Sequence, residues 1–425
     1  MLNHPFITTL KNLRGNVRAC VYTEPLWGIP FNLYAPYVSL YMLAFGLTDS
    51  QIGLVTTIGM VCSVLWTVIS GAITDKLGRK RTTLIFDIIS WSVPCLIWAI
   101  AHNFTYFVVA AIINSVWRVT HNSWQCLLVE DADPRLLVDV YSWVYIGGLL
   151  AAFFSPLAGL LVARFSLVPT MRGLYVLAFA MMTAKFLLNN AMATETRQGL
   201  VRMQETRGQP LFAVLRESPA VLRQILRSPV TLFTGALILL VNICWMVRGT
   251  FWSILVTEKL QIPAEHLPLY SLARSIVMLL FFFLIMPRLR HMDVRKPMVL
   301  GFLALIASQV MLVSVPAKNE PLLLVATALE ACGVPAASTL LDKLVVLTVN
   351  AQERARTMAI LYTIVIVLNS PFGWIAGRLS EVNRSLPFVL NIVLFSIAGL
   401  LTYLAIRLAT GMAASDPATG KAAPA

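Results

Sequence analysis

Long uncharged segments recur from one end of the chain to the other. Eight of them contain no Asp, Glu, Lys or Arg, and they cover residues 25–48, 50–74, 88–117, 140–163, 228–247, 297–317, 357–377 and 385–406. A helix of about 20 apolar residues is long enough to cross the hydrocarbon core of a bilayer. Each segment therefore predicts a membrane-spanning helix.

Four further spans appear when a few charged residues are allowed inside a segment. They cover residues 104–129, 169–193, 266–286 and 322–349, which brings the predicted number of helices to twelve. Backbone groups in lipid must satisfy their hydrogen bonds internally, so segments of this length are helical. The alternating pattern of a membrane β-barrel is absent from the sequence. We predict an all-α integral membrane protein.

The composition agrees with a membrane location. Of the 425 residues, 58% are hydrophobic and only 12% are charged, and the mean hydropathy is +0.76. A soluble protein of this size carries considerably more charge on its surface. The composition therefore excludes the soluble classes of protein.

The positive charges are distributed unevenly between the predicted loops. Of the 33 Lys and Arg residues, 22 fall in loops on one side of the membrane and six fall on the other side. The positive-inside rule assigns the richer side to the cytoplasm, which places both termini there. The net charge of +13 thus reflects the topology of the chain and does not predict binding of nucleic acid. We predict a multi-pass protein of the cytoplasmic (inner) membrane, with membrane lipids as partners.

The two halves of the sequence resemble each other weakly at an offset of about 215 residues. Arg79-Lys80 recurs as Arg295-Lys296, and Ser155-Pro156 recurs as Ser370-Pro371. Internal repeats of this kind are typical of secondary transporters. We predict a cytoplasmic N-terminus (1–20), a first six-helix bundle (21–193), a cytoplasmic amphipathic linker (194–228), a second six-helix bundle (229–408) and a disordered tail (409–425).

A short polar loop, which runs from Gly71 to Arg81, joins the second and third spans. It resembles the loop between helices 2 and 3 of the major facilitator superfamily, whose signature there is GxxxDxxGRK or GxxxDxxGRR. The match covers Gly71, Asp75, Gly78, Arg79 and Lys80. The resemblance implies the major facilitator fold, in which 12 transmembrane helices form two pseudo-symmetric six-helix bundles.

The same resemblance implies a conformational gate. In the superfamily the signature aspartate latches the two halves in the outward-facing form, which implies this role for Asp75. The other gate candidates are the glycines and cations of the loop and three charged residues before the eleventh span, namely Gly71, Gly78, Arg79, Lys80, Arg81, Glu353, Arg354 and Arg356. The alternative is that these cations only fix the topology.

A polar stripe lies inside the fourth span. Asn114, Arg118, His121 and Gln125 are spaced four, three and four residues apart, which places them on one face of a helix. Such a face inside a membrane is expected to line a wet cavity. The stripe partly resembles the helix 4 RxxQG motif of proton-coupled drug exporters, with His121 in place of Gln. Arg118 then either binds a substrate carboxylate or phosphate or forms a structural ion pair.

Three charged residues of the second half, Arg248, Arg274 and Glu330, are predicted to lie at similar depth in the membrane. This group is either structural or exchanges a proton or an anionic substrate for one of its own ion pairs. Helices 1 and 7 line the pathway in the superfamily, which adds three aromatic candidates: Tyr34, Tyr37 and Trp245. Packing in the helix bundle is the alternative role for these rings.

We predict a secondary transporter that moves a small organic solute by alternating access. The sequence contains no Walker motif, catalytic triad or metal-ligand spacing, so we expect no enzyme activity and no cofactor. Proton coupling through Glu330, His121 or Asp87 is the favoured mechanism.

The substrate and the direction of transport leave alternatives open. The partial exporter motif favours proton-coupled efflux of drugs or metabolites. The intramembrane cations favour proton-coupled uptake or exchange of an anionic solute, such as an organic acid or a phosphorylated compound. A non-transporting membrane receptor is the remaining alternative, and we expect a monomer.

Overall fold

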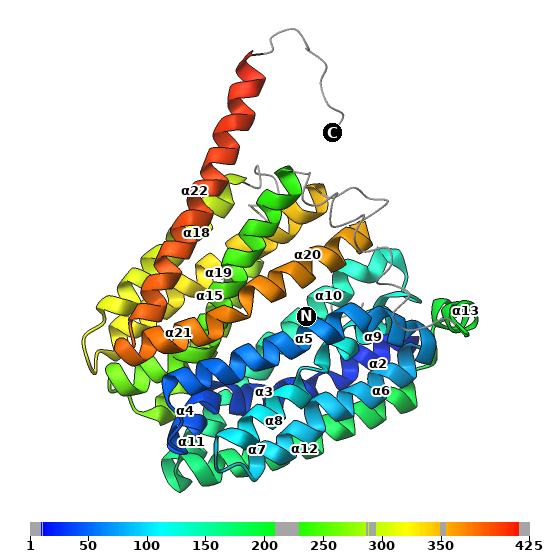
Figure 1. Cartoon of the computed structure of the whole chain (residues 1–425), viewed down its shortest axis with the longest axis horizontal. Helices are drawn as coiled ribbons and strands as arrows, with labels where there is room; N and C mark the ends of the chain where they lie inside the picture. The colour runs from blue at the N-terminus through cyan, green and yellow to red at the C-terminus, as the bar shows by residue number, and fades with distance from the viewer. Residues whose placement is uncertain are drawn as a thin grey trace.

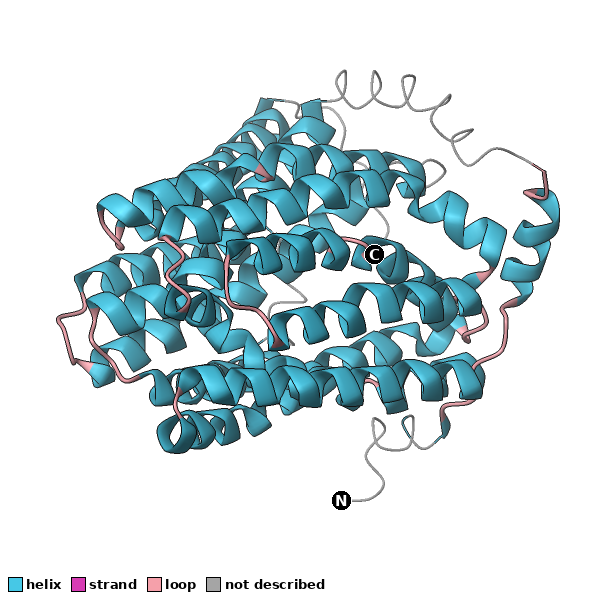
Figure 2. Cartoon of the chain, turned by 60° about the horizontal axis from the view of Figure 1, so that its bottom comes forward, coloured by secondary structure: helices cyan, strands magenta, loops and turns pink. Residues whose placement is uncertain are grey.

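The computed structural model describes residues 10, 12–208, 229–285, 288, 295–348 and 354–415. These residues are almost entirely helical (Figure 2). Within them, ten helices are long and apolar enough to cross a membrane. The other two of the twelve predicted spans, the first and the fourth, are helical as well, but each consists of shorter pieces.

Prolines divide the first span. It consists of α2 (Gly15–Thr23), α3 (Pro25–Tyr34), the 3₁₀ turn η1 (Ala35–Tyr37) and α4 (Val38–Ala44). Pro25 begins α3, and Pro30 lies inside it. Proline lacks a backbone N–H and disturbs the preceding turn, so the helix bends where prolines occur.

The fourth span is interrupted once, between α8 (Phe104–Asn114) and α9 (Trp117–Val129). At the break, the Ser115 hydroxyl donates a hydrogen bond of 2.6 Å to the carbonyl oxygen of Ile112. Serine hydroxyls compete with the backbone for such carbonyls and often bend helices. Neither α8 nor α9 alone reaches the length of a membrane span, so the fourth predicted span is not among the ten.

The remaining helices of the first half follow the predicted order. They are α5 (Asp49–Leu77), α6 (Arg79–Asp87), the π-helical turn η2 (Ile88–Ser92), α7 (Val93–Ala99), η3 (Pro134–Leu136), α10 (Leu137–Ala151), η4 (Ala152–Phe154), α11 (Ser155–Phe165) and α12 (Leu167–Met192). A short helix of the predicted linker, α13 (Arg197–Glu205), comes next. Residues 209–228 of that linker lie outside the described residues.

The second half has a matching order of helices. They are α15 (Pro229–Ile254), η6 (Leu255–Lys259), η7 (Ala264–His266), α16 (Leu267–Leu280), η8 (Phe281–Ile285), α18 (Arg295–Ser314), α19 (Glu320–Thr348), α20 (Arg354–Asn369), α21 (Pro371–Val382) and α22 (Leu386–Ser415). Pro371 starts α21 just as Pro156 lies in the first turn of α11. The repeated serine–proline step thus breaks corresponding helices in the two halves.

The two halves lie side by side, and several pairs of helices join them (Figure 1). Two of these pairs are α5 with α21 and α11 with α16. Gly53 of α5 faces Gly373 and Gly377 so closely that an added Cβ would collide with their backbone. Gly159 of α11 faces the backbone of Glu265 in the same way. Small residues let helix backbones approach closely in membranes, so glycine sets both contacts.

Large apolar side chains remain on the outside of the bundle. Leu65, Leu160 and Val382 are 69%, 68% and 79% exposed. A water-soluble surface rarely exposes so many large apolar side chains, whereas lipid accommodates them. The exposed surface therefore agrees with a protein embedded in a bilayer.

Candidate functional site

Polar contacts between the halves gather at the end of the molecule opposite the signature loop. The Asp49 carboxylate accepts a hydrogen bond of 2.6 Å from Ser380 and lies 3.6 Å from the Arg384 guanidinium. The Glu381 carboxylate accepts hydrogen bonds from the Ser50 N–H and hydroxyl at 3.2 and 3.0 Å. These contacts join the start of α5 to the end of α21 and its loop. The halves are therefore tied together at this end.

The signature loop forms its contacts within the first half and the linker. Asp75 lies 2.9 Å from Arg79 and 3.0 Å from Arg202 of α13. Arg79 also pairs with Glu130 at 2.9 Å. The hydrogen bond to Asp75 raises the pKa of the Arg202 guanidinium. Among the described residues, neither Asp75 nor Arg79 contacts a charged group of the second half.

Gly78 separates α5 from α6 with a φ of 83°, a conformation that favours glycine. This turn lets the N–H groups of Arg79 and Lys80 donate to the Glu195 carboxylate at 2.8 and 3.1 Å. A Cβ on Gly78 would collide with that same carboxylate. The first residues of the linker are therefore docked on the signature loop.

Of the other predicted gate residues, only Gly71 and Arg81 can be compared with this network, and neither belongs to it. Glu353 lies outside the described residues, as do the side chains of Arg354 and Arg356. A Cβ added to Gly71 would have only the Asn122 amide as a neighbour, at 4.0 Å, and Arg81 is exposed. Sequence reasoning missed the partners Glu130, Glu195 and Arg202. The sequence indicates these partners only weakly: they are charged residues that follow predicted spans.

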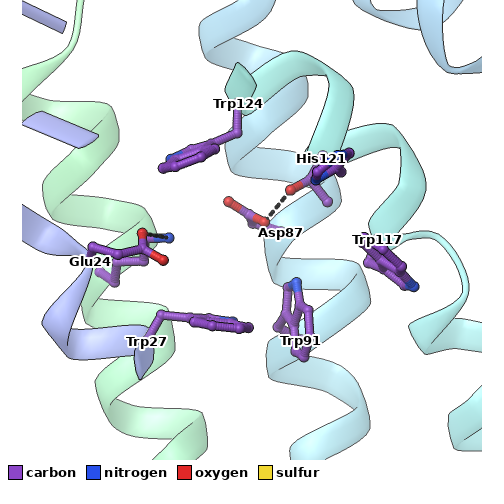
Figure 3. A pocket seen from close by; sticks show the side chains of 9 residues that line it. Glu24, Trp27, Asp87, Trp91, Trp117, His121 and Trp124 are labelled. Carbon is purple, nitrogen blue, oxygen red and sulfur yellow. Dashed lines mark hydrogen bonds and ion pairs between the residues drawn. The ribbon is translucent and has the colours of Figure 1, made fainter. Parts of the chain in front are cut away.

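A cavity of about 300 Å³ lies within the first half, among the pieces of the first, third, fourth and sixth spans. Its lining is unusually aromatic for so small a space (Figure 3). The residues that line it are Glu24, Trp27, Asp87, Trp91, Trp117, Thr120, His121, Trp124 and Lys185. Four tryptophans thus share the wall with two carboxylates, one ammonium and one imidazole.

One opposite-charge pair neutralises part of this lining. The Lys185 ammonium lies 3.0 Å from the Glu24 carboxylate, and the two side chains are only 7% and 17% exposed. The same ammonium lies 5.6 Å from the Trp124 ring centroid and 6.0 Å from that of Trp27. Rings at this distance attract a cation through their electron-rich faces. The ion pair and the rings hold Lys185 in place.

Asp87 differs from Glu24 in its partners. It is 4% exposed, and its carboxylate accepts a hydrogen bond from the Thr120 hydroxyl. In the described part of the chain, no cation lies within 4.0 Å of it. Figure 3 shows the Asp87 carboxylate among the tryptophans, toward the Glu24 side. Thr120 is therefore the hydrogen-bond partner of this buried carboxylate, and Lys185 lies beyond ion-pair distance.

The predicted polar stripe of the fourth span divides between different neighbours. Asn114 donates to the Ser90 carbonyl oxygen at 2.7 Å, and Gln125 accepts from the Tyr141 hydroxyl at 3.0 Å. Arg118 lies 4.2 Å above the Trp117 ring. Of the four predicted residues, His121 alone lines the cavity. The break at Ser115 and Val116 turns the two ends of the stripe in different directions.

The aromatic candidates of the first and seventh spans lie in packed regions. Tyr34 and Tyr37 are 3% and 0% exposed, and Tyr34 packs on Tyr175 with ring centroids 5.1 Å apart. Trp245 packs on Phe395 with ring centroids 6.3 Å apart. In this state they belong to the core of the bundles and not to the cavity wall.

The three predicted charges of the second half do come together. The Arg248 Nε contacts Glu330 Oε1, and the Arg274 Nε lies 3.7 Å from the same oxygen. The side chain of Glu330 is 4% exposed. The similar membrane depth that the sequence predicts for these three residues therefore agrees with their contact in the structure.

Comparison with known proteins identifies the fold. Members of the major facilitator superfamily match residues 27–289 of the chain, and no curated protein matches it. A point mutant of the nucleoside transporter NupG has 14% identity, a TM-score of 0.71, and coverage of 91% of this chain and 99% of its own.

Two other solved structures show the same fold. The human organic anion transporter MFSD10 (TETRAN) has 15% identity, a TM-score of 0.62 and coverage of 91% and 98%. A POT family transporter in complex with 5-aminolevulinic acid has 12% identity, a TM-score of 0.67 and coverage of 92% and 95%. With its helical architecture and its signature loop, this chain belongs to the major facilitator superfamily and is a transporter, not an enzyme.

Proposed function

We propose that this protein is a proton-coupled exporter of small aromatic solutes, which bind in the tryptophan-walled cavity of the first half. The observation that carries the proposal is the position of Asp87, a buried carboxylate without an ion pair in a cavity lined by four tryptophans. Such a site combines a surface for flat rings with a group that takes up a proton.

The cavity wall supports an aromatic solute. Trp27 and Trp91 meet edge to face with ring centroids 5.1 Å apart, and Trp117 and Trp124 face the same space from α9. Aromatic rings pack favourably in stacked and edge-to-face arrangements with other rings. A volume of about 300 Å³ lies at the small end of ligand pockets, which suits a solute with one or two rings.

The charges of the cavity support proton coupling. Glu24 and Lys185 neutralise each other, so the remaining charge of the lining is set by Asp87 and the His121 imidazole. Buried charges are strongly disfavoured unless they are paired. Proton binding at Asp87 therefore changes the free energy of the occupied cavity, which is what coupling requires.

The contacts between the halves describe the state of the transporter, and the partial exporter motif supports the direction of transport. The positive-inside rule assigns the signature loop to the cytoplasm, and the opposite end is the one held together by Asp49, Glu381 and Arg384. A state closed toward the outside exchanges solute with the cytoplasm, as an exporter does when it loads and an importer does when it releases. The resemblance of the Arg118 region to the exporter motif favours export.

Binding of a flat ring tests the cavity. Purified protein is titrated calorimetrically with benzamide and with cyclohexanecarboxamide, which is similar in size but not aromatic. Trp91→Ala is expected to weaken benzamide binding about tenfold, since one aromatic contact contributes on the order of 1 kcal/mol. The control Trp374→Ala changes a tryptophan that is 47% exposed and outside the cavity. Equal binding of both amides would contradict the proposal.

Proton movement tests the coupling. Proteoliposomes that contain a pH-sensitive dye are given benzamide under an imposed pH gradient, and the sidedness of the response reports direction. Asp87→Asn is expected to abolish solute-dependent proton movement and to leave benzamide binding within about threefold of the parent, because it retains shape and hydrogen bonding. Asp133→Asn, in a loop, is the control. Undiminished proton movement in Asp87→Asn would exclude this carboxylate as the coupling site.

A further inference from the structure

The second half contains a group of charges that does not balance. Arg248 and Arg274 approach the same oxygen of Glu330. Their side chains are 18% and 27% exposed, and that of Glu330 is 4% exposed. In the described residues no other acid lies within 4.0 Å of either guanidinium. Since arginine stays protonated in proteins, the group carries a net charge of about +1 in an apolar bundle.

The two guanidiniums also keep donors free for a further ligand. Each approaches Glu330 through its Nε, and neither Nε nor Glu330 Oε1 has a well-aligned hydrogen bond. Among the described residues the terminal N–H groups of Arg248 and Arg274 have no hydrogen-bond partner of their own. A guanidinium binds a carboxylate or phosphate through two parallel N–H donors. The terminal N–H groups of the two arginines are thus suited to bind an oxyanion.

Neighbouring rings hold the group in position. The Arg248 guanidinium lies 5.3 Å from the Trp252 ring centroid, which fixes its plane. Tyr145 of α10, in the first half, packs on Phe282, which follows α16, with ring centroids 4.9 Å apart. The helix α16, which carries Arg274, itself contacts α10. The charged group therefore faces the junction of the two halves.

We propose that Arg248 and Arg274 form a binding site for an oxyanion, a carboxylate or a phosphate, and that Glu330 occupies this site when it is empty. The site is separate from the tryptophan-walled cavity, whose lining contains neither arginine, so this inference goes beyond the proposed function and does not rest on it. The bound oxyanion removes the surplus positive charge that the group otherwise carries.

The test compares three probes on the purified full-length protein. Benzoate and benzamide share a ring and differ in charge, while inorganic phosphate supplies an oxyanion without a ring. We expect benzoate to bind about tenfold more tightly than benzamide in calorimetric titrations, because a guanidinium pair adds a charge-assisted contact. Phosphate that binds in an Arg274-dependent way while benzoate gains nothing would assign the site to a free inorganic anion.

Two variants and a control connect the effect to the site. Arg274→Gln is expected to remove the preference for benzoate over benzamide, and Arg274→Lys to retain only part of it, since lysine keeps the charge but not the planar fork. Arg378→Gln is the control, because this guanidinium is 63% exposed and pairs with Glu381. Unchanged benzoate preference in Arg274→Gln would overturn the inference.

The results separate this inference from the proposed function. Equal binding of benzoate and benzamide, with both lost in Trp91→Ala, would overturn the oxyanion site and support the aromatic cavity. Binding of benzoate and phosphate that depends on Arg274 but not on Trp91 would support the oxyanion site. The aromatic cavity is tested separately, by the dependence of benzamide binding on Trp91. Unfolding temperatures without ligand show whether each variant is folded.

Discussion

The two halves of the molecule each bury a cluster of charges, and the clusters are opposite in balance. In the first half, Glu24 and Lys185 form one pair, and Asp87 is an additional acid beside them. In the second half, Glu330 faces two arginines, so a cation is in excess. The two halves therefore carry different chemistry inside their helix bundles.

The difference lies in how each excess charge is compensated. The first cluster is surrounded by tryptophans and can lose its surplus charge by binding a proton at Asp87. Arginine does not release its proton in this way, so the second cluster can be neutralised only by another anion. This contrast favours proton binding in the first half and anion binding in the second, and the following experiments test it.

The largest expected effect is the loss of the Lys185 ammonium from the first cluster. Lys185→Met leaves Glu24 and Asp87 without the cation that balances one of them. Removing one partner of a buried ion pair costs on the order of 3–5 kcal/mol. We expect the free energy of unfolding to fall by about this amount in denaturant titrations in detergent, followed by tryptophan fluorescence.

A second substitution serves as the control for this prediction. The double variant Glu24→Gln with Lys185→Met removes both charges and is expected to recover most of the lost stability, because neutral groups are far cheaper to bury. If the single and the double variant were equally unstable, lost packing of the lysine chain and not its charge would explain the result.

The twelve-helix fold could be predicted from the sequence to a large extent. Uncharged segments such as 50–74 became the long helix α5, and the Ser-Pro steps became helix breaks, because length and proline chemistry act locally. The break between α8 and α9 was not predicted. It occurs at Ser115 without proline or glycine, so the local sequence carries little indication of it.

The candidate site could be predicted only in part. Arg248, Arg274 and Glu330 were grouped from their depth alone, and they do meet. The cavity residues Trp91, Trp124 and Lys185 were not grouped, because they come from three different spans and their contact depends on helix rotation. One sequence does not fix the rotation of each helix about its axis, whereas hydrophobic length fixes its depth.

A smaller effect is expected when the second cluster loses its acid. Glu330→Gln leaves two guanidiniums beside each other, but these are 18% and 27% exposed, so water and counter-ions reduce the cost to about 2 kcal/mol. Added phosphate is expected to restore much of this stability, because a ligand that binds only the folded state stabilises it.

Comparison with the first cluster sharpens the measurement of Glu330→Gln. Lys185→Met has surplus negative charge, so phosphate should not restore its stability. The same denaturant titrations are repeated over a range of phosphate concentrations at constant ionic strength, which separates binding from screening. Equal rescue of both variants would show a general salt effect and would remove the contrast between the clusters.

The smallest expected effect is also the most specific for the second cluster. Arg274→Met turns two cations and one acid into a single pair of Arg248 with Glu330, and methionine fills much of the same volume. The lost attraction and the relieved repulsion between the arginines largely cancel, so we expect stability to change by less than about 1 kcal/mol. A loss as large as that of Lys185→Met in the same titrations would mean that Arg274 is needed to balance Glu330. Both arginines would then be needed to stabilise Glu330, and the cluster would be a structural network. It would carry no excess positive charge that could bind an anion.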